Sequence, residues 1–116
     1  MASELIWTDA AAKTFGDLHA SARTSYETRK RTKKTKASKQ EGLFKQVVKC
    51  LDLLAANPRH PGLQTHPFTA LPHPYKPGEK VFEAYAQHRT SGAYRVFWCY
   101  GPGQREITIL AIPPHP

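Results

Sequence analysis

The sequence has no long hydrophobic run and only two cysteines. No apolar stretch approaches the roughly 20 residues that a membrane-spanning helix needs. The N-terminal stretch MASELIWTDAAAK lacks the basic segment and apolar core of a secretory signal. We therefore expect a cytoplasmic protein with no membrane attachment. In that compartment Cys50 and Cys99 are interpreted as small buried side chains, and a disulfide between them is the disfavoured alternative.

Acidic residues are also few. Nine Asp and Glu stand against 17 Lys and Arg, which gives a net charge of +8. Ten of the basic residues lie between Arg23 and Lys49. A field of this sign attracts polyanions and speeds their association, so we expect nucleic acid as a partner, bound in a salt-dependent way. The alternative is that the basic run is only a solvated face or a flexible arm.

The length and the hydrophobic content fit one folded unit. The chain has 116 residues, of which 40% are hydrophobic, and this is enough for a modest core. The same composition excludes global disorder, and no internal repeat is evident. We expect a single domain that spans residues 1–116.

The first half of the sequence has the pattern of two helices. Residues 4–7, ELIW, predict a short strand, and Thr8 follows it as a helix N-cap. The polar segment 28–40, TRKRTKKTKASKQ, is the end of the first helix or the tip of a helical hairpin, and it is either helical or disordered. Between them, apolar residues recur at helical spacing, at Phe15, Leu18, Ala22 and Tyr26.

A second helix is predicted to begin after Ser38. Ser38 and Glu41 match a capping box, in which each side chain satisfies a backbone donor near the other residue. Pro58 ends the helix, because proline lacks an amide donor and disfavours a helical residue before it. The helix carries a wide apolar stripe, formed by Leu43, Phe44, Val47, Val48, Leu51 and Leu54.

The second half changes to the pattern of strands. Segments rich in proline and glycine separate four short apolar or alternating runs, at residues 62–68, 80–86, 93–101 and 106–112. Helices followed by strands predict an α+β fold. We expect an N-terminal helical hairpin packed on an antiparallel sheet of about four strands, with a possible short N-terminal strand.

This order of elements, together with the stretches LLAANPRHPGLQTHPF, KVFEAY, GAYRVFWCYG and ITILAIPPHP, resembles the RelE/ParE superfamily of bacterial toxins. These proteins are the toxin halves of type II toxin–antitoxin pairs. The resemblance covers most of residues 43–116. Its most specific parts are the helix that ends in NPRHPGL, the YR that opens a central strand, and the histidine after the final strand. It implies the RelE-like form of the α+β fold.

The resemblance implies one of two activities. RelE-like members cleave mRNA in the ribosomal decoding site without a metal, and ParE-like members inhibit DNA gyrase. Both are neutralised by a cognate antitoxin that wraps the toxin. We expect the first activity, a ribosome-associated mRNA endoribonuclease that inhibits translation and needs neither metal nor cofactor. The alternatives are a non-enzymatic gyrase inhibitor and a nucleic-acid-binding domain without toxicity.

Arg95 and His115 are the first candidates for catalysis. Cleavage of RNA without a metal needs a proton acceptor, a proton donor and cations around the phosphate. The planar guanidinium of Arg95 suits the phosphate, and Arg95 matches the arginine that RelE-like enzymes place on the sheet; the alternative is an ion pair with Glu83. His115 follows the last strand, where family members carry a catalytic His or Arg, and an imidazole exchanges protons near neutral pH. Its alternative is an ordinary histidine near the C-terminus.

Four residues of the stretch 80–89, KVFEAYAQHR, form a second group of candidates. Glu83 is interpreted as a base or as the partner of Arg95. Tyr85 is interpreted as a platform for a nucleobase or as half-buried packing. Lys80 and Arg89, near the strand ends, are expected to hold phosphates or to be solvated.

The basic run supplies the remaining candidates. On a ribosome it is expected to bind ribosomal RNA, and in a gyrase inhibitor the hairpin is instead the contact surface. The RNA-binding candidates are Arg29, Lys30, Arg31, Lys33, Lys34 and Lys36. The spacing of His60, His66 and His73 fits no familiar ligand pattern, so no metal site is predicted.

Overall fold

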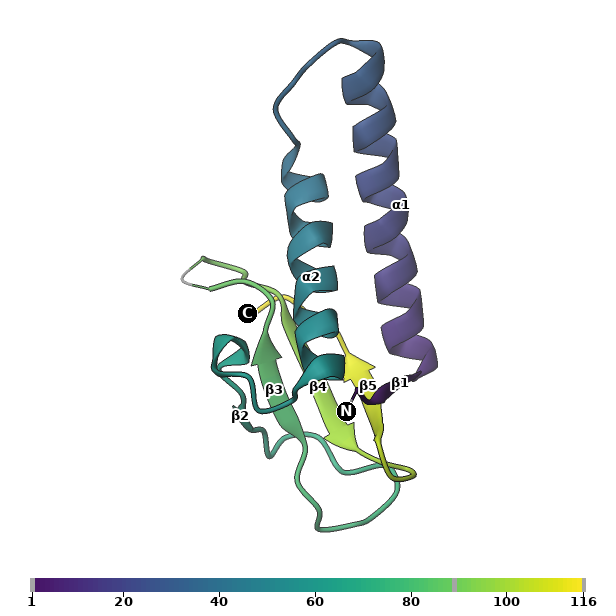
Figure 1. Ribbon diagram of the computed structural model, residues 1–116, viewed down its shortest axis with the longest axis vertical. Coiled ribbons are helices and arrows are strands. Elements are labelled where there is room, and N and C mark those ends of the chain that lie inside the picture. The colour runs from purple at the N-terminus through teal and green to yellow at the C-terminus, as the bar shows by residue number, and fades with distance from the viewer. Residues whose placement is uncertain (1, 89, 116) are drawn as a thin grey trace.

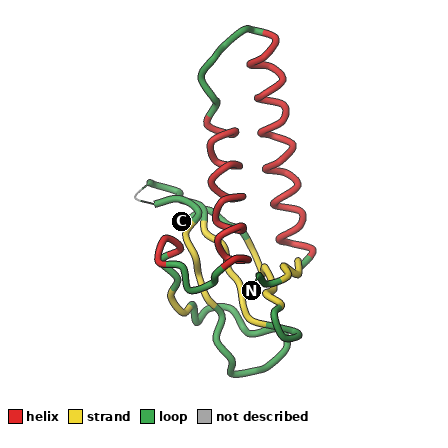
Figure 2. Tube along the Cα trace, viewed as in Figure 1, coloured by secondary structure: helices red, strands yellow, loops and turns green. Residues whose placement is uncertain are grey.

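The computed structural model describes residues 2–88 and 90–115. A helical hairpin packs on one face of a sheet and extends well beyond it, so that the molecule measures 51 × 26 × 25 Å (Figure 1; Figure 2). The elements are β1 (Glu4–Trp7), α1 (Asp9–Arg31), α2 (Lys39–Ala56), the 3-10 turn η1 (Pro61–Leu63), β2 (His66–Pro67), β3 (Phe82–Tyr85), β4 (Arg95–Tyr100) and β5 (Glu106–Ala111). The predicted α+β fold is confirmed.

The sheet has five strands in the order β1-β5-β4-β3-β2. The N-terminal strand β1 runs parallel to β5, and the other neighbouring strands are antiparallel. The run over residues 62–68, where Pro67 favours an edge position or an early end, forms a strand only at His66 and Pro67, at the edge of the sheet, and Pro61–Leu63 forms a 3-10 turn. Proline lacks the amide that would continue the ladder.

The predicted N-cap of the first helix is confirmed. The hydroxyl of Thr8 accepts a hydrogen bond from the amide of Ala11 at 3.1 Å. It also donates to the carbonyl of Leu110 at 2.8 Å. One side chain therefore satisfies a free backbone donor of α1 and ties the start of the hairpin to the adjacent sheet strand.

The hairpin tip is ordered by a capping box and an ion pair. The amide of Glu41 donates to the Ser38 hydroxyl at 3.2 Å, and the Glu41 carboxylate accepts from the Ser38 amide at 2.6 Å. Arg29 reaches across the tip to the same carboxylate at 3.0 Å. Of the segment 28–40, which was predicted to be helical or disordered, α1 includes the residues up to Arg31 and α2 begins at Lys39.

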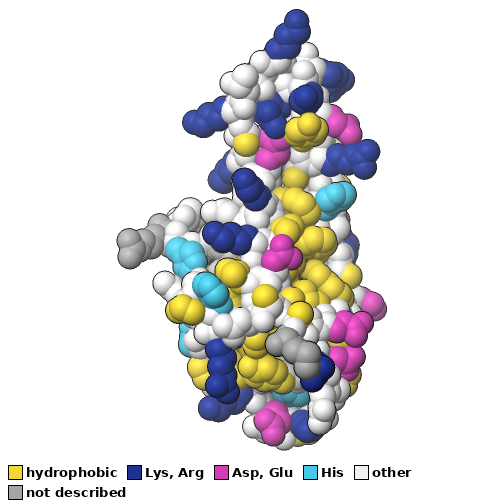
Figure 3. Space-filling view, viewed as in Figure 1, with side chains coloured by type: hydrophobic (Ala, Val, Ile, Leu, Met, Phe, Trp, Pro, Cys, Tyr) yellow, Lys and Arg dark blue, Asp and Glu magenta, His cyan; other side chains and the backbone are white. Residues whose placement is uncertain are grey.

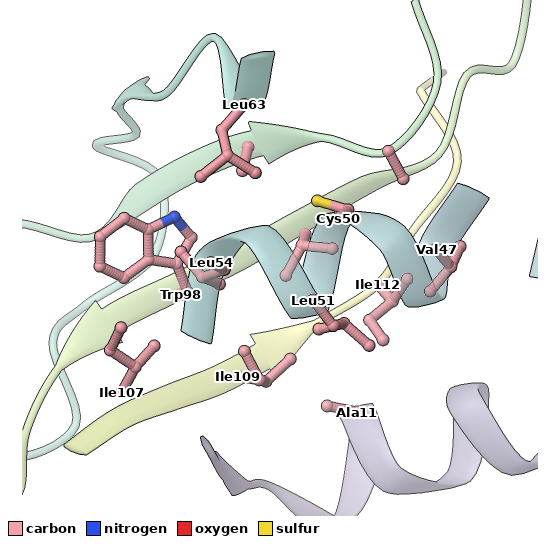
Figure 4. Packing of buried hydrophobic residues seen from close by; sticks show 13 residues of the cluster. Ala11, Val47, Cys50, Leu51, Leu54, Leu63, Trp98, Ile107, Ile109 and Ile112 are labelled. Carbon is pink, nitrogen blue, oxygen red and sulfur yellow. The ribbon is translucent and has the colours of Figure 1, made fainter. Parts of the chain in front are cut away.

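The core lies between the helices and one face of the sheet (Figure 4). α2 contributes most of the helical side chains, and Trp98 is the largest fully buried residue. The cluster contains Ala11, Val47, Cys50, Leu51, Leu54, Leu63, Ala84, Ala86, Val96, Trp98, Ile107, Ile109 and Ile112. Because the helices cover only one face of the sheet, the opposite face is available for polar side chains.

Both cysteines are buried and unbridged, as predicted. Burial raises the pKa of the Cys50 thiol to about 12 and that of Cys99 to about 11, so both stay protonated and unreactive at neutral pH. Within the described residues, no helix is both long and apolar enough to cross a membrane.

Candidate active site and nucleic-acid interface

The sheet face turned away from the helices carries a cluster of polar side chains. Ala84 of β3 and Val96 of β4 belong to the core beneath the helices. Side chains alternate along a strand, so the neighbours Glu83, Tyr85 and Arg95 lie on the opposite face. Tyr85 and Arg95 are also register partners. Strand alternation and pairing therefore bring three of the four predicted catalytic residues together.

Glu83 is the centre of this cluster. Its Oε1 accepts a hydrogen bond from Nη1 of Arg95 at 3.0 Å, and its Oε2 lies 3.2 Å from Nε2 of His66. The side chains of Glu83 and Arg95 are 4% and 10% exposed, whereas that of His66 is 47% exposed. A buried charge must be paired, and here each carboxylate oxygen has a partner of its own.

Arg95 is accommodated among aromatic side chains by two contacts. It pairs with Glu83, and its guanidinium carbon lies 4.8 Å from the centroid of the Phe97 ring. The ion pair with Glu83, which was the alternative prediction, is therefore present. The Nε atom of Arg95 is buried and has no hydrogen-bond partner among the described residues. Arg95 thus keeps one donor that the protein itself does not use.

Tyr85 lies at the edge of the cluster and is half-buried. Its ring centroid is 5.7 Å from that of His66 and 6.0 Å from that of His88. Burial raises the pKa of Tyr85, and the negative charge of Glu83 and a hydrogen bond to that carboxylate raise it further, against the opposing charge of Arg95. Tyr85 is therefore a neutral phenol at physiological pH and can donate a hydrogen bond.

His115 reaches the same region from the C-terminal segment. Its amide donates to the carbonyl of Ala93 at 2.7 Å, and the amide of Arg95 donates to the carbonyl of Pro113 at 3.0 Å. These bonds hold the segment beside β4. A cavity of about 440 Å³ results, lined by Gln64, Tyr85, Gln87, His88, Thr90, Ser91, Ala93 and His115. All four predicted catalytic residues thus lie in or next to one region.

Two histidines of this region were not predicted as site residues. His66 was weighed for a metal site and for an approach to the groove of the sheet, but its turn-rich surroundings and two-residue strand give little sequence signal to fix its place. His88 lies three residues after Tyr85 and lines the cavity. The register of His66 opposite Glu83 depends on tertiary structure, which local sequence patterns do not contain.

The remaining candidates of the β3 region lie elsewhere. Lys80 is exposed and lies before the end of β3 that is opposite to Tyr85. It lines another cavity, of about 410 Å³, together with Phe68 and Val81. Arg89, which was predicted to hold phosphates, lies outside the described residues.

The basic tip of the hairpin divides into one inward arginine and several exposed cations. Arg29 is 20% exposed, and the hydrogen bonds that it donates to Glu41 are the main cause that lowers the pKa of Glu41 to about 2. The dark blue side chains around the upper end of the hairpin in Figure 3 illustrate the resulting positive surface. The exposed cations are Lys30, Arg31, Lys33, Lys34 and Lys36.

The described histidines do not gather into a metal site. His60 accepts a hydrogen bond from the amide of Gly62 at 2.9 Å, and the buried His73 contacts the carbonyl of Tyr100 at 3.0 Å. Across residues 2–88 and 90–115, no group of three or more His, Cys, Asp or Glu side chains could hold a metal ion.

Solved structures of toxins share this architecture. The YoeB/ParE toxin from Agrobacterium tumefaciens matches with a TM-score of 0.57 at 9% identity, over 97% of this chain and 99% of that chain. A chain of the archaeal RelE-RelB complex from Pyrococcus horikoshii OT3 matches with a TM-score of 0.57 at 14% identity, over 98% and 96%. The YoeB dimer from Staphylococcus aureus gives 0.55 at 9% identity over all of both chains.

No protein-family model and no curated protein matches the sequence. The structural likeness extends over nearly the whole of each chain, the hairpin and the sheet included. The chain therefore has the fold of the RelE/ParE superfamily of toxins.

Proposed function

We propose that this chain is the toxin of a type II toxin–antitoxin pair, and that it cleaves mRNA on the ribosome, in the cytoplasm, without a metal. The observation that carries the proposal is the cluster of Glu83, Tyr85 and Arg95 beside the cavity that His115 lines. A guanidinium, a carboxylate, a phenol and an imidazole are the kinds of group that metal-free RNA cleavage uses. The fold of known toxins supports the same conclusion.

The reaction needs two proton transfers and one anion-binding group. A base removes the proton of a ribose 2′-hydroxyl, and that oxygen attacks the neighbouring phosphorus. The bond from phosphorus to the 5′ oxygen breaks, and an acid protonates the leaving oxygen. The products are a 2′,3′-cyclic phosphate and a 5′-hydroxyl. Negative charge grows on the phosphate during attack, so donors fixed around it accelerate the step.

Each residue of the cluster has a role in this scheme. His115 is the proton acceptor, because its side chain is exposed on the cavity wall and an imidazole changes charge near neutral pH. Arg95 stabilises the phosphate through the tenth of its side chain that remains exposed. Tyr85, kept neutral by its raised pKa, donates a hydrogen bond from its phenol. Glu83 holds Arg95 in place.

The hairpin tip is proposed to bind ribosomal RNA. Its cations are exposed, and they lie at the end of the molecule opposite to the sheet (Figure 1; Figure 3). Contacts to phosphates position a protein without reading the nucleotide sequence. We propose that such contacts to ribosomal RNA orient the sheet face toward the messenger. Arg29 orders the tip by its bond to Glu41 and is not part of this contact.

A cognate antitoxin is the proposed protein partner. The likeness to a chain of the RelE-RelB complex supports it. We expect the antitoxin to be encoded next to this chain, and we expect its co-expression to restore the growth of cells that produce the toxin.

Primer extension on a messenger in a reconstituted translation reaction tests the proposed activity. We expect discrete cuts in the decoding site that need ribosomes and persist at the lowest metal concentration that ribosomes tolerate. Tyr85→Phe, which removes one donor, should slow cleavage by about tenfold or more. The matched control is Tyr26→Phe, because Tyr26 is exposed on α1.

An intact messenger and normal translation would refute the ribonuclease proposal. Inhibition of gyrase supercoiling by the same preparation would then identify the ParE-like activity. A salt-sensitive RNA complex with neither effect would instead indicate a plain nucleic-acid-binding domain.

A further inference from the structure

His66 is the exposed member of the buried cluster. Glu83 and Arg95 are nearly inaccessible, at 4% and 10%, and both oxygens of Glu83 already have partners. A substrate therefore cannot reach the carboxylate directly. The imidazole of His66, at 47% exposure, contacts that carboxylate on one side and is open to solvent over about half of its surface. Of Glu83, Arg95 and His66, only His66 has a ring open enough to exchange a proton with a substrate.

The two ring nitrogens of His66 both face acceptors. Nε2 lies 3.2 Å from Oε2 of Glu83, and Nδ1 lies 3.3 Å from the backbone carbonyl oxygen of Gln64. An imidazole that carries a proton on each nitrogen satisfies both acceptors, whereas a neutral ring satisfies only one. Gln64 also lines the cavity that contains His115. The ring of His66 therefore lies beside this cavity, in contact with Gln64 and Tyr85, which both line it.

Four titratable or charged groups lie around His66. Glu83, from β3, is the only ionised group that touches the ring among the described residues. Tyr85, also from β3, packs its ring at 5.7 Å and stays neutral. Arg95 of β4 lies behind the carboxylate and is paired with its other oxygen. His88 meets Tyr85, at 6.0 Å between ring centroids.

We propose that His66 is the general acid of the RNA-cleavage reaction and that Glu83 is its positioning residue. The inference rests on the proposed function and deepens it. His115 takes the proton of the 2′-hydroxyl as the new P–O bond forms. His66 gives its Nδ1 proton to the 5′ oxygen as the old P–O bond breaks. His66 ends neutral and His115 protonated, and exchange with water through their exposed rings restores the starting state.

A leaving-group substitution separates this role from a structural one. In a messenger with a 5′-bridging phosphorothiolate at the cut site, sulfur replaces the leaving oxygen and leaves without protonation. We expect His66→Gln to slow single-turnover cleavage of the oxygen substrate by about 100-fold or more and to cleave the sulfur substrate at nearly the wild-type rate. His19→Gln, on the exposed side of α1, is the matched control and should be normal on both substrates.

The pH profile supplies a second measure. A general acid must be protonated, so wild-type cleavage of the oxygen substrate should fall at high pH. In the His66→Gln variant, the cleavage rate should no longer fall at high pH. Glu83→Gln keeps the side-chain shape but lacks the charge, and we expect it to move the fall to lower pH. A thermal melt of each variant verifies that it is folded.

The outcomes separate the two claims. If the wild type cuts and His66→Gln is equally slow on both substrates, or as fast as wild type, His66 is not the acid and the proposed function stands. If the wild type cuts neither substrate on the ribosome, the proposed function fails and this inference fails with it. Selective rescue by sulfur supports both.

Discussion

The molecule contains two Arg–Glu pairs with the same chemistry and different surroundings. At the hairpin tip, Nε of Arg29 donates to both oxygens of Glu41 at 3.1 Å, and the Ser38 amide donates to the same carboxylate. On the sheet, Arg95 makes one bond to Glu83 and its Nε lacks a partner among the described residues. In the tip pair, both oxygens of Glu41 and the Nε of Arg29 have hydrogen-bond partners, so this pair orders the loop. The sheet pair keeps one buried donor without a partner and adjoins Tyr85 of the candidate site.

The largest expected difference between the two pairs concerns stability. Arg95→Ala leaves the carboxylate of Glu83, which is 4% exposed, without its guanidinium. Removing one partner of a buried pair typically costs about 3–5 kcal/mol. Arg29→Ala should cost less, because water can reach the tip and the Ser38 amide still binds Glu41. Urea unfolding of both variants measures the difference.

Equal losses of unfolding free energy in the two variants would show that the sheet pair contributes no more stability than the tip pair. Arg23→Ala is the control, because the Arg23–Glu27 pair is 71% and 60% exposed and should contribute almost nothing.

The next effect concerns RNA affinity at the tip. Replacing Lys30, Lys33 and Lys34 by glutamine removes three exposed cations. We expect weaker binding to ribosomal RNA and a salt dependence whose slope falls by about one unit for each lost phosphate contact. Cleavage at saturating concentration should be unchanged, because the sheet face is untouched. Filter binding across a salt series measures the slope.

A charge-matched variant controls for net charge alone. Lys13, Lys45 and Lys49 are exposed on the helices away from the tip, and their replacement by glutamine should leave most of the slope intact. If both triple variants lose affinity equally, the tip has no special role in binding.

The smallest expected effect is the acid response of the tip. The Arg29 guanidinium and the Ser38 hydrogen bonds lower the pKa of Glu41 to about 2, against about 4.3 in an unfolded chain. The folded value lies below the unfolded one, so this stabilisation is complete above about pH 4.3 and is lost as the pH falls toward 2. Glu41→Gln should flatten the stability profile in this window, measured by thermal unfolding.

An unchanged acid limb in Glu41→Gln would show that the tip pair adds no stability. Glu27→Gln, which affects only the exposed Arg23 pair, is the control and should follow the wild type.

The helices could be predicted from the sequence because their signals are local. Thr8 and the Ser38–Glu41 capping box set the helix starts, and such caps act within one helical turn. The strands of the second half followed from their apolar or alternating pattern. The sequence also indicated that Pro67 would place its run at a sheet edge or end it early, and β2 is an edge strand that ends at Pro67.

The candidate site was only partly predictable. The Glu83–Arg95 pair was named as an alternative, because a hairpin brings adjacent strands into register. His66 was not assigned to the site, because its contact with Glu83 joins segments 17 positions apart through a two-residue strand. Arg29 was grouped with the other tip cations, although its pairing with Glu41 depends on how the chain turns between the helices.

The central claim is that the sheet pair belongs to the proposed catalytic site, where Arg95 stabilises the phosphate, whereas the tip pair only orders the hairpin. Two matched substitutions, Arg95→Lys and Arg29→Lys, test it in one experiment, the single-turnover cleavage of a ribosome-bound messenger. A lysine keeps the charge but loses the planar fork of donors. We predict a loss of about 100- to 1000-fold for Arg95→Lys and a nearly normal rate for Arg29→Lys. A normal rate for Arg95→Lys, or an equal loss in both variants, would contradict the account.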